Sequence, residues 1–359
     1  MHIAQVAPLY ESVPPKLYGG TERIVAYLTE ELIAQGHEVT LFASGDSRTS
    51  ADLVSPCDQA IRLDENGPDA AALHVLMLEQ LNQLAYDFDV IHFHTEHIQL
   101  PFARRQTTPC VVTLHGRLDV PGLTELYAEF RDVPVVSISN AQREPLPGAH
   151  WQGTVYHGLP LKLHCCSRES GSYLAFLGRI APEKGVDRAI EIAQRAGVPL
   201  KIAAKVDAAD REYFETQIEP RIDGTSVELI GEINEREKTA FLGNARALLF
   251  PIDWPEPFGL VMIEAMACGT PSIAFRNGSV PEVIDEGVTG FIVESIDAAV
   301  AAVAEAQTLD RRRCRQMFER RFSAARMARD YCKIYETLLR RGKQAHAAVS
   351  PRATASDAG

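Results

Sequence analysis

Short apolar runs alternate with amphipathic stretches through the first part of the chain. Apolar positions at residues 3–8 and 38–43 predict two strands, and the stretch at 21–35 has the periodicity of a helix that stops at Gly36. Similar patterns predict strands at 90–93, 110–114, 133–138 and 153–156 and helices at 70–84 and 122–130. Alternation of this kind predicts a mostly parallel sheet with helices on both faces.

A polar, turn-forming stretch at 161–172 interrupts this pattern, which then restarts. The second part of the chain predicts strands at 173–177, 200–204, 227–230, 247–250, 272–274 and 290–293 and helices at 186–196, 210–221, 235–244, 258–268 and 296–307. We therefore predict an α/β fold with two doubly wound, Rossmann-like domains. The domains are expected to face each other across a cleft, because ligands of open α/β sheets bind at the carboxyl ends of the strands.

The domain boundaries follow from these patterns. Residues 1–160 are predicted to form an N-terminal domain and residues 161–322 a C-terminal domain, in keeping with a length of 359 residues. A helix at 323–341 is expected to cross back to the N-terminal domain. Residues 342–359, rich in alanine, serine and small polar residues, are expected to be disordered.

Composition limits the classes of function. A net charge of -12 repels nucleic acid and anionic lipid over most of the surface, so an anionic substrate must be held by local basic residues. No run of about 20 apolar residues predicts a transmembrane helix, and the first residues lack the pattern of a signal peptide. The 7 cysteines are scattered without a C-x-x-C pair, which is typical of free thiols. We expect a cytoplasmic protein without a structural metal.

Paired glycines lie between the first predicted strand and the first predicted helix. Gly19 and Gly20 would let the backbone approach a ligand closely, and the helix start would offer unpaired N–H groups to an anion. An ordinary turn with Thr21 as the helix cap explains the same residues. The segment lacks the G-x-G-x-x-G pattern of dinucleotide-binding domains.

A second motif follows the first strand of the second domain, at Gly178–Gly185. Arg179 can bond two phosphate oxygens at once and Lys184 can act as a point charge, so the segment suits a diphosphate. A solvated loop with surface cations is the alternative.

The most specific motif is the run from Glu256 to Pro271. Pro255 and Pro257 hold Glu256 in extended backbone, outside the helix that is predicted to begin near Phe258. The first amides of that helix would be free to bond a ligand, and Glu264 lies further along it. A helix with one exposed glutamate after a stiff loop is the plainer explanation.

Taken together, these motifs resemble glycosyltransferase family 4, whose members are retaining enzymes with the GT-B fold. Glu256 and Glu264 resemble the E-x7-E motif of that family, and Gly178–Gly185 resembles its G-R-x-x-x-E-K-G segment. The glycine pair, residues 113–116 and residues 137–139 also match, so the resemblance spans both domains up to the final helix.

The resemblance implies a role for each matching residue on the donor side. Glu264 would bind the ribose hydroxyls of a nucleotide sugar. Arg179, Lys184 and the Gly20 amide would hold its diphosphate.

The resemblance also implies the residues of the reacting centre. His115 and Glu256 would be catalytic, and Phe258, Gly259 and Leu260 would contact the transferred sugar. Cations and helix amides would stabilise the departing diphosphate, which requires neither a metal nor another cofactor. No protein nucleophile is assigned.

Some segments depart from the family pattern. Lys205 stands where a glycine-rich turn is frequent, so it could contact phosphate or cap the turn. Tyr156 and His157 replace the more usual Asn-Gly where the chain passes between domains. Residues 277–282 look typical of the family, but their sequence does not identify their contacts.

Two sets of residues could be mistaken for metal sites. Asp87 and Asp89 form a D-x-D pattern, but they precede a strand and therefore belong to the edge away from the cleft. His92, His94 and His97 could suggest zinc, although a buried strand followed by a cleft-edge loop explains them better.

We therefore predict a hexosyltransferase that uses a nucleotide sugar, with UDP-glucose as the first candidate from the family. The acceptor, which could be a small molecule, a glycan or a lipid-linked sugar, is not identified by the sequence. A non-hydrolysing sugar-nucleotide epimerase and a non-catalytic nucleotide-sugar-binding protein are the alternatives.

Overall fold

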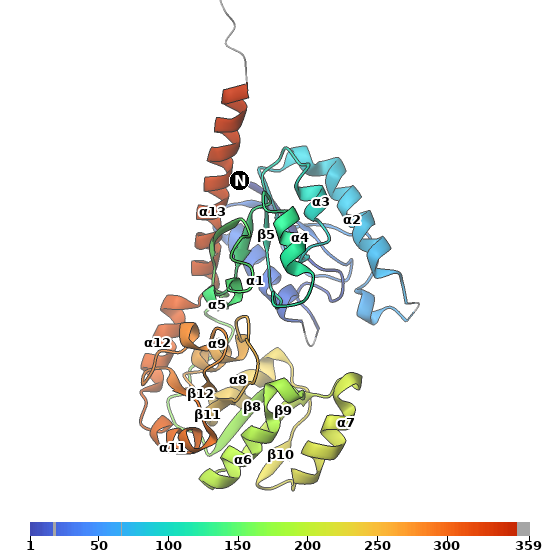
Figure 1. Cartoon of the computed structure of the whole chain (residues 1–359). Helices are drawn as coiled ribbons and strands as arrows, with labels where there is room; N and C mark the ends of the chain where they lie inside the picture. The colour runs from blue at the N-terminus through green and yellow to red at the C-terminus, as the bar shows by residue number, and fades with distance from the viewer. Residues whose placement is uncertain (17–18, 66, 350–359) are drawn as a thin grey trace, which may run out of the picture.

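The computed structural model describes residues 1–16, 19–65 and 67–349, arranged around two parallel sheets (Figure 1). The first sheet has the order β3-β2-β1-β4-β5-β6-β7 and the second the order β10-β9-β8-β11-β12-β13. This confirms the predicted α/β fold with two Rossmann-like sheets. None of the described helices is long and apolar enough to cross a membrane.

The first sheet is built from seven short strands that are parallel throughout. Its strands are β1 His2–Val6, β2 Glu38–Phe42, β3 Asp52–Val54, β4 Val90–Phe93, β5 Cys110–Thr113, β6 Val135–Ser137 and β7 Trp151–Thr154. Its helices are α1 Gly20–Ala34, α2 Ala70–Leu84, α3 Leu100–Ala103, α4 Leu123–Glu129 and α5 Asn140–Arg143. Every residue of β4 and β5 is buried, as expected for central strands covered on both faces.

The second sheet repeats this arrangement. Its strands are β8 Tyr173–Arg179, β9 Leu200–Lys205, β10 Val227–Leu229, β11 Ala245–Phe250, β12 Ser272–Phe275 and β13 Gly290–Val293. Its helices are α6 Val186–Ala196, α7 Arg211–Tyr213, α8 Glu235–Gly243, α9 Leu260–Ala267, α10 Val280–Val283, α11 Ile296–Ala306 and α12 Arg311–Arg321.

The last helix, α13 (Ala324–Val349), leaves the second domain and packs against α1 of the first (Figure 1). Tyr331 and Tyr335 on this helix are fully buried. They belong to one apolar cluster with Leu28 of α1 and Met262 of α9, so the two domains share part of a core.

The chain passes between the domains at two places, and these lie side by side. The N–H of Leu159 donates to the carbonyl of Phe322, and the N–H of Ala324 donates to the carbonyl of Leu159, both at 2.8 Å. Gly158 fits here because a Cβ atom would lie 2.4 Å from the carbonyl oxygen of Ser323. A side chain at this position would push the two crossings apart.

Several element bounds differ from the predictions. Helix α9 begins at Leu260 instead of Phe258, because Gly259 has a left-handed φ of 76°. The predicted helix at 210–221 is helical, but it changes from an α-helix (α7, Arg211–Tyr213) to a π-helix and then to a 3₁₀ turn. Strand β3 and helix α12 were not predicted. Helix α13 continues to Val349, past the predicted end at residue 341. The expected disorder of residues 350–359 falls outside the described residues.

The crowding at Gly158 leads to a stability prediction. Gly158→Ala should lower the free energy of unfolding by about 1–3 kcal/mol, because the added methyl group meets backbone that cannot rotate away. Denaturant unfolding measures the change. Gly148→Ala is the matched control, since a Cβ atom at Gly148 has no neighbour within 4 Å. Equal stability of the two variants would show that the crossing is not tightly packed.

Candidate functional site

A cleft of about 870 Å³ lies between the two domains and is lined by residues of both. It brings together all the residues nominated from the sequence: Gly20, His115, Arg179, Lys184, Glu256, Phe258, Gly259, Leu260 and Glu264. Lys205 and His97 line the same cleft. The carboxyl ends of the central strands of both sheets therefore contribute to a single site.

The N-terminal end of α1 forms one wall of the cleft. The helix begins at Gly20, and a Cβ atom at this position would lie 3.6 Å from Cδ1 of Leu260 in the other domain. The start of α1 therefore faces the start of α9 across the cleft. Two helix N-termini directed at one space favour a bound anion.

The first turn of α9 offers unpaired backbone donors. The first backbone hydrogen bond here runs from the N–H of Met262 to the carbonyl of Gly259. The N–H groups of Phe258, Gly259 and Leu260 donate to no group of the described residues, although these residues line the cleft. Such amides can donate to oxygen atoms of a ligand.

Residues 277–279 support the loop in front of α9. The side-chain amide of Asn277 donates to the carbonyl of Ile252 at 2.8 Å, and the hydroxyl of Ser279 donates to that of Phe258 at 2.8 Å. Gly278 has a φ of 53°, and a Cβ atom there would lie 2.3 Å from the carbonyl oxygen of Glu256. The sequence did not identify the contacts of residues 277–282. In the structure, residues 277–279 of this segment hold the backbone around Glu256 in place.

The cations nominated for a diphosphate are held by carboxylates. Nζ of Lys184 lies 2.6 Å from Oε2 of Glu256 and 4.2 Å from the centre of the Trp254 ring. The guanidinium of Arg179 lies 3.2 Å from Glu183, 3.5 Å from Asp210 and 3.6 Å from Asp207. Lys205 pairs with the same Asp207 at 3.0 Å. These ion pairs keep the positive charges on the cleft wall.

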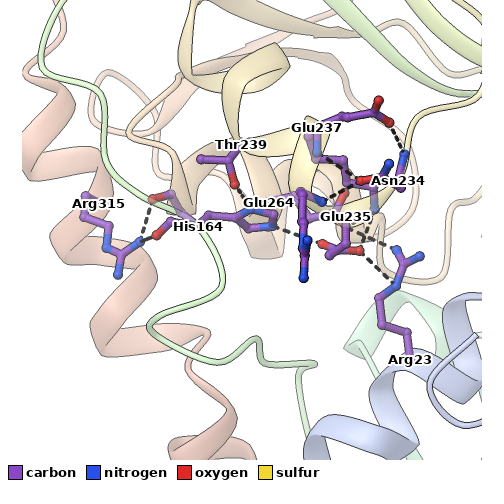
Figure 2. A network of polar contacts seen from close by, with 11 residues as sticks. Arg23, His164, Asn234, Glu235, Glu237, Thr239, Glu264 and Arg315 are labelled. Atoms are coloured by element: carbon purple, nitrogen blue, oxygen red, sulfur yellow. Dashed lines mark hydrogen bonds and ion pairs between the residues drawn. The ribbon is translucent and has the colours of Figure 1, made fainter. Parts of the chain in front are cut away.

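Glu264 lies in a charged cluster that joins the two domains (Figure 2). Its Oε1 is 2.7 Å from Nζ of Lys238 on α8 and 3.5 Å from Nη1 of Arg23, which extends from α1. Its Oε2 is buried and has no hydrogen-bond partner among the described residues. Because Glu264 lines the cleft, this oxygen could accept a hydrogen bond from a ligand hydroxyl.

The same cluster contains the one grouping of metal-ligand type among the described residues. Ligand atoms of His164, Glu235 and Glu264 lie within 4.8 Å of one another. However, Lys238 and Arg23 contact both carboxylates, so two positive charges would repel a divalent ion. We interpret these residues as an ion-pair network.

The pKa of Glu235 agrees with that interpretation. Burial raises it, but His164, Lys238 and Arg23 together lower it to about 2. Glu235 is therefore a carboxylate at neutral pH, matched by the cations around it.

His115 is oriented by a chain of buried side chains. The side-chain amide nitrogen of Gln5 donates to the hydroxyl of Tyr335 at 3.2 Å. This bond orients the Gln5 side chain so that its amide oxygen lies 2.8 Å from Nε2 of His94. Nε2 of His94 must then carry the proton, and Nδ1 of His94 accepts from Nε2 of His115 at 2.8 Å. Nδ1 of His115 is left as a buried acceptor without a partner among the described residues.

Burial keeps these histidines neutral. It lowers the pKa of His115 to about 3 and the pKa values of His92 and His94 well below the usual range. Both ring nitrogens of His92 are also occupied, at 2.7 Å each, by the hydroxyls of Tyr335 and Thr113. His92 and His94 therefore have no nitrogen left for zinc, and His97 lies apart on the cleft edge.

The two aspartates of the D-x-D pattern contact the start of the chain. The backbone N–H of His2 donates to Asp89 at 2.8 Å, and the ring of His2 contacts the carbonyl of Asp87 at 2.8 Å. Both aspartates lie at the amino end of β4, whereas the cleft residues follow its carboxyl end.

The structure adds cleft residues that the sequence did not nominate. His157 stacks on His115 with ring centres 5.3 Å apart and packs in a T-shaped arrangement with Phe258, with ring centres 4.8 Å apart. Arg23 follows the glycine pair closely in the sequence, so proximity to that motif was a signal for it. For Glu96, which also lines the cleft, the sequence carried no signal.

Two models of known protein families match most of the chain. The family model "Glycosyltransferase Family 4" matches residues 18–180, and the model "Glycosyl transferases group 1" matches residues 167–321. Together they cover the second sheet, the first sheet apart from β1, and every nominated residue.

Individual proteins resemble the chain along nearly its full length. A phosphatidyl-myo-inositol mannosyltransferase of Mycobacterium leprae is 25% identical over 391 residues, which covers 97% of this chain and 100% of the relative. A sucrose-phosphate synthase from Thermosynechococcus elongatus has a TM-score of 0.77 at 19% identity, covering 95% of this chain and 99% of the other.

A second solved structure that resembles the chain contains a ligand. HepE of Anabaena in complex with UDP-glucose has a TM-score of 0.68 at 18% identity, covering 94% of this chain and 99% of the other. The fold, the matching family models and the cleft agree, and the chain belongs to glycosyltransferase family 4.

Proposed function

We propose that this protein transfers a hexose, with glucose the first candidate, from a UDP-sugar to an acceptor hydroxyl with retention of anomeric configuration. One observation carries the proposal: α9 combines unpaired amides at its start with an unpaired carboxylate oxygen of Glu264 further along. These groups suit, respectively, the phosphate and the ribose of a nucleotide. The UDP-glucose bound to HepE supports this choice of donor.

In this proposal the nucleotide lies along the second domain. Oε2 of Glu264 accepts hydrogen bonds from the ribose hydroxyls, while Lys238 and Arg23 hold Oε1. The amides of Gly20 and Leu260 donate to the diphosphate, and Lys184 and Arg179 offset its charge. Electrostatic stabilisation of the departing diphosphate is then the main contribution to catalysis.

The transferred sugar occupies the space between the two domains. Nδ1 of His115 accepts a hydrogen bond from a sugar hydroxyl, which relieves an unpaired buried nitrogen. Glu256 and the amides of Phe258 and Gly259 contact the sugar from the opposite wall. Attack on the same face as the departing diphosphate would retain the configuration without a protein nucleophile.

A nucleotide-sugar screen tests the proposal. Thermal stabilisation by UDP-glucose, followed by release of UDP when acceptors are added, is the expected result. Interconversion of donor sugars without release of UDP would indicate an epimerase instead. Binding without either reaction would indicate a non-catalytic protein.

Turnover should not depend on a divalent metal. Cations of the protein and two helix N-termini already offset the diphosphate charge in the proposed arrangement. We expect the rate of UDP release to be unchanged by EDTA. Loss of activity with EDTA that added magnesium or manganese restores would overturn this expectation.

Glu264→Ala should weaken UDP binding. A charge-assisted hydrogen bond to ribose contributes about 1.5–3 kcal/mol, so the Kd measured by calorimetry should rise about 10- to 100-fold. Glu305→Ala, on the exposed part of α11, is the control. A Kd equal to that of the control would remove Glu264 from ribose binding.

His115→Ala should separate catalysis from nucleotide binding. The side chain comes from the first domain, so kcat and kcat/KM should fall together by about 10²-fold while the Kd for UDP stays the same. Steady-state kinetics and calorimetry measure the two quantities. Near-normal turnover with a lowered Tm would instead indicate that His115 is a packing residue.

A further inference from the structure

Glu96 has an unusual backbone conformation at the edge of the cleft. It follows β4 and has a φ of 58°, the one left-handed value for a non-glycine residue in the described part of the chain. Such a conformation is uncommon for a side chain larger than that of asparagine. Strained residues of this kind concentrate at functional sites because the surrounding structure holds them in place.

The carboxylate of Glu96 is fixed from one side. Its Oε1 accepts from the backbone N–H groups of His115 at 3.1 Å and Gly116 at 3.0 Å. The carbonyl of Glu96 accepts from the side-chain amide of Gln99 at 2.9 Å and from the hydroxyl of Tyr127 at 3.3 Å. The side chain is therefore tied to the turn that carries His115.

The other carboxylate oxygen is uncommitted. The hydrogen bonds that the described residues make to this carboxylate go to Oε1 and leave Oε2 without a partner among them. Glu96 lines the cleft together with His115. The ion pairs of the described residues do not include this carboxylate. This partly buried carboxylate lies on the first-domain wall of the cleft, across from the second-domain groups that we assign to the donor nucleotide.

We propose that Glu96 binds the attacking hydroxyl of the acceptor and removes its proton. This inference rests on the function proposed above. The acceptor oxygen forms a bond to the anomeric carbon while the bond from that carbon to the diphosphate oxygen breaks. The bonding electron pair leaves with UDP, and the hydroxyl proton passes to Oε2 of Glu96 and then to solvent.

The protonation state of Glu96 fits this role. Burial raises the pKa of Glu96 to about 7, although the N–H groups of His115 and Gly116 lower it in part. A base is most effective when its pKa is close to the working pH. Because only the ionised form can take a proton, the rate should rise as the pH increases through about 7.

The titratable groups around Glu96 would not produce the same dependence of rate on pH. Tyr127 faces it from α4, and burial raises the pKa of that hydroxyl far above neutrality. His115 faces it from the end of β5, and burial lowers its pKa to about 3. His97 is the neighbour on its own loop, and His97→Asn is therefore one control for the pH profile.

A second carboxyl provides a matched control. Glu22 of α1 also lines the cleft, and burial raises its pKa to about 7. If the change of rate with pH is due to Glu96, the loss of rate at acidic pH (the acidic limb of the pH–rate profile) should persist in Glu22→Gln. It should disappear in Glu96→Gln. The glutamine at 96 still has an oxygen for the N–H groups of His115 and Gly116, so the turn should be preserved.

The experiment uses water as the probe acceptor, with release of UDP from UDP-glucose measured between pH 5.5 and 8.5. Glu96→Gln should lower kcat by about 10²-fold and give a flat profile, with the Kd for UDP and the Tm unchanged. Release of UDP by Glu96→Gln at the normal rate with the normal profile would overturn the assignment. A lost rate with a lowered Tm and a retained acidic limb would also overturn it, in favour of a structural role. Absence of UDP binding by the unaltered protein would instead refute the proposed function.

Discussion

The cleft depends on the paired backbone crossings between the two domains. Leu159 exchanges hydrogen bonds with Phe322 and Ala324, so the outgoing and returning segments form a single connection. A nearby contact strengthens it: Glu282 of α10 accepts from the N–H groups of Asn140 and Ala141 at the start of α5. Since each domain supplies half of the cleft, these contacts decide how the halves meet.

The returning helix α13 also contacts the residues that orient the histidines of the cleft. Tyr335 contacts both Gln5 and His92, and Gln5 in turn fixes the protonated nitrogen of His94. Burial removes the charge from these rings, so hydrogen bonding alone determines how His115 presents its free nitrogen. The last helix of the chain is thus connected to a side chain at the proposed reacting centre, far away in sequence.

Hydrophobic patterns within short segments predicted most of the strands and several of the helices. The central strands were predicted because they are buried on both faces and read as continuous apolar runs. The predicted helix at 70–84 coincides with α2. Helix α9 began later than predicted because Gly259 adopts a left-handed conformation that the sequence permits without requiring. Pro220 has no N–H to donate, which helps to explain why the predicted helix at 210–221 ends in a 3₁₀ turn.

The nominated site residues all line the cleft because they belong to motifs at the carboxyl ends of strands. The groups that hold those residues were less visible, since they depend on tertiary contacts. Lys238 reaches Glu264 from a different helix, and Arg23 reaches it from the other domain. Glu96 stands out through its backbone angle and its hydrogen bonds to residues 115 and 116, neither of which a sequence pattern encodes.

The central claim is that a nucleotide sugar spans the cleft from Glu264 to His115. A crystal structure of the protein with UDP-glucose tests it most directly. The account predicts ribose hydroxyls at hydrogen-bond distance from Oε2 of Glu264, phosphate oxygens at the amides of Gly20 and Leu260, and the sugar between His115 and Glu256. A nucleotide bound with its ribose away from Glu264, or with its sugar outside the space between the domains, would contradict it.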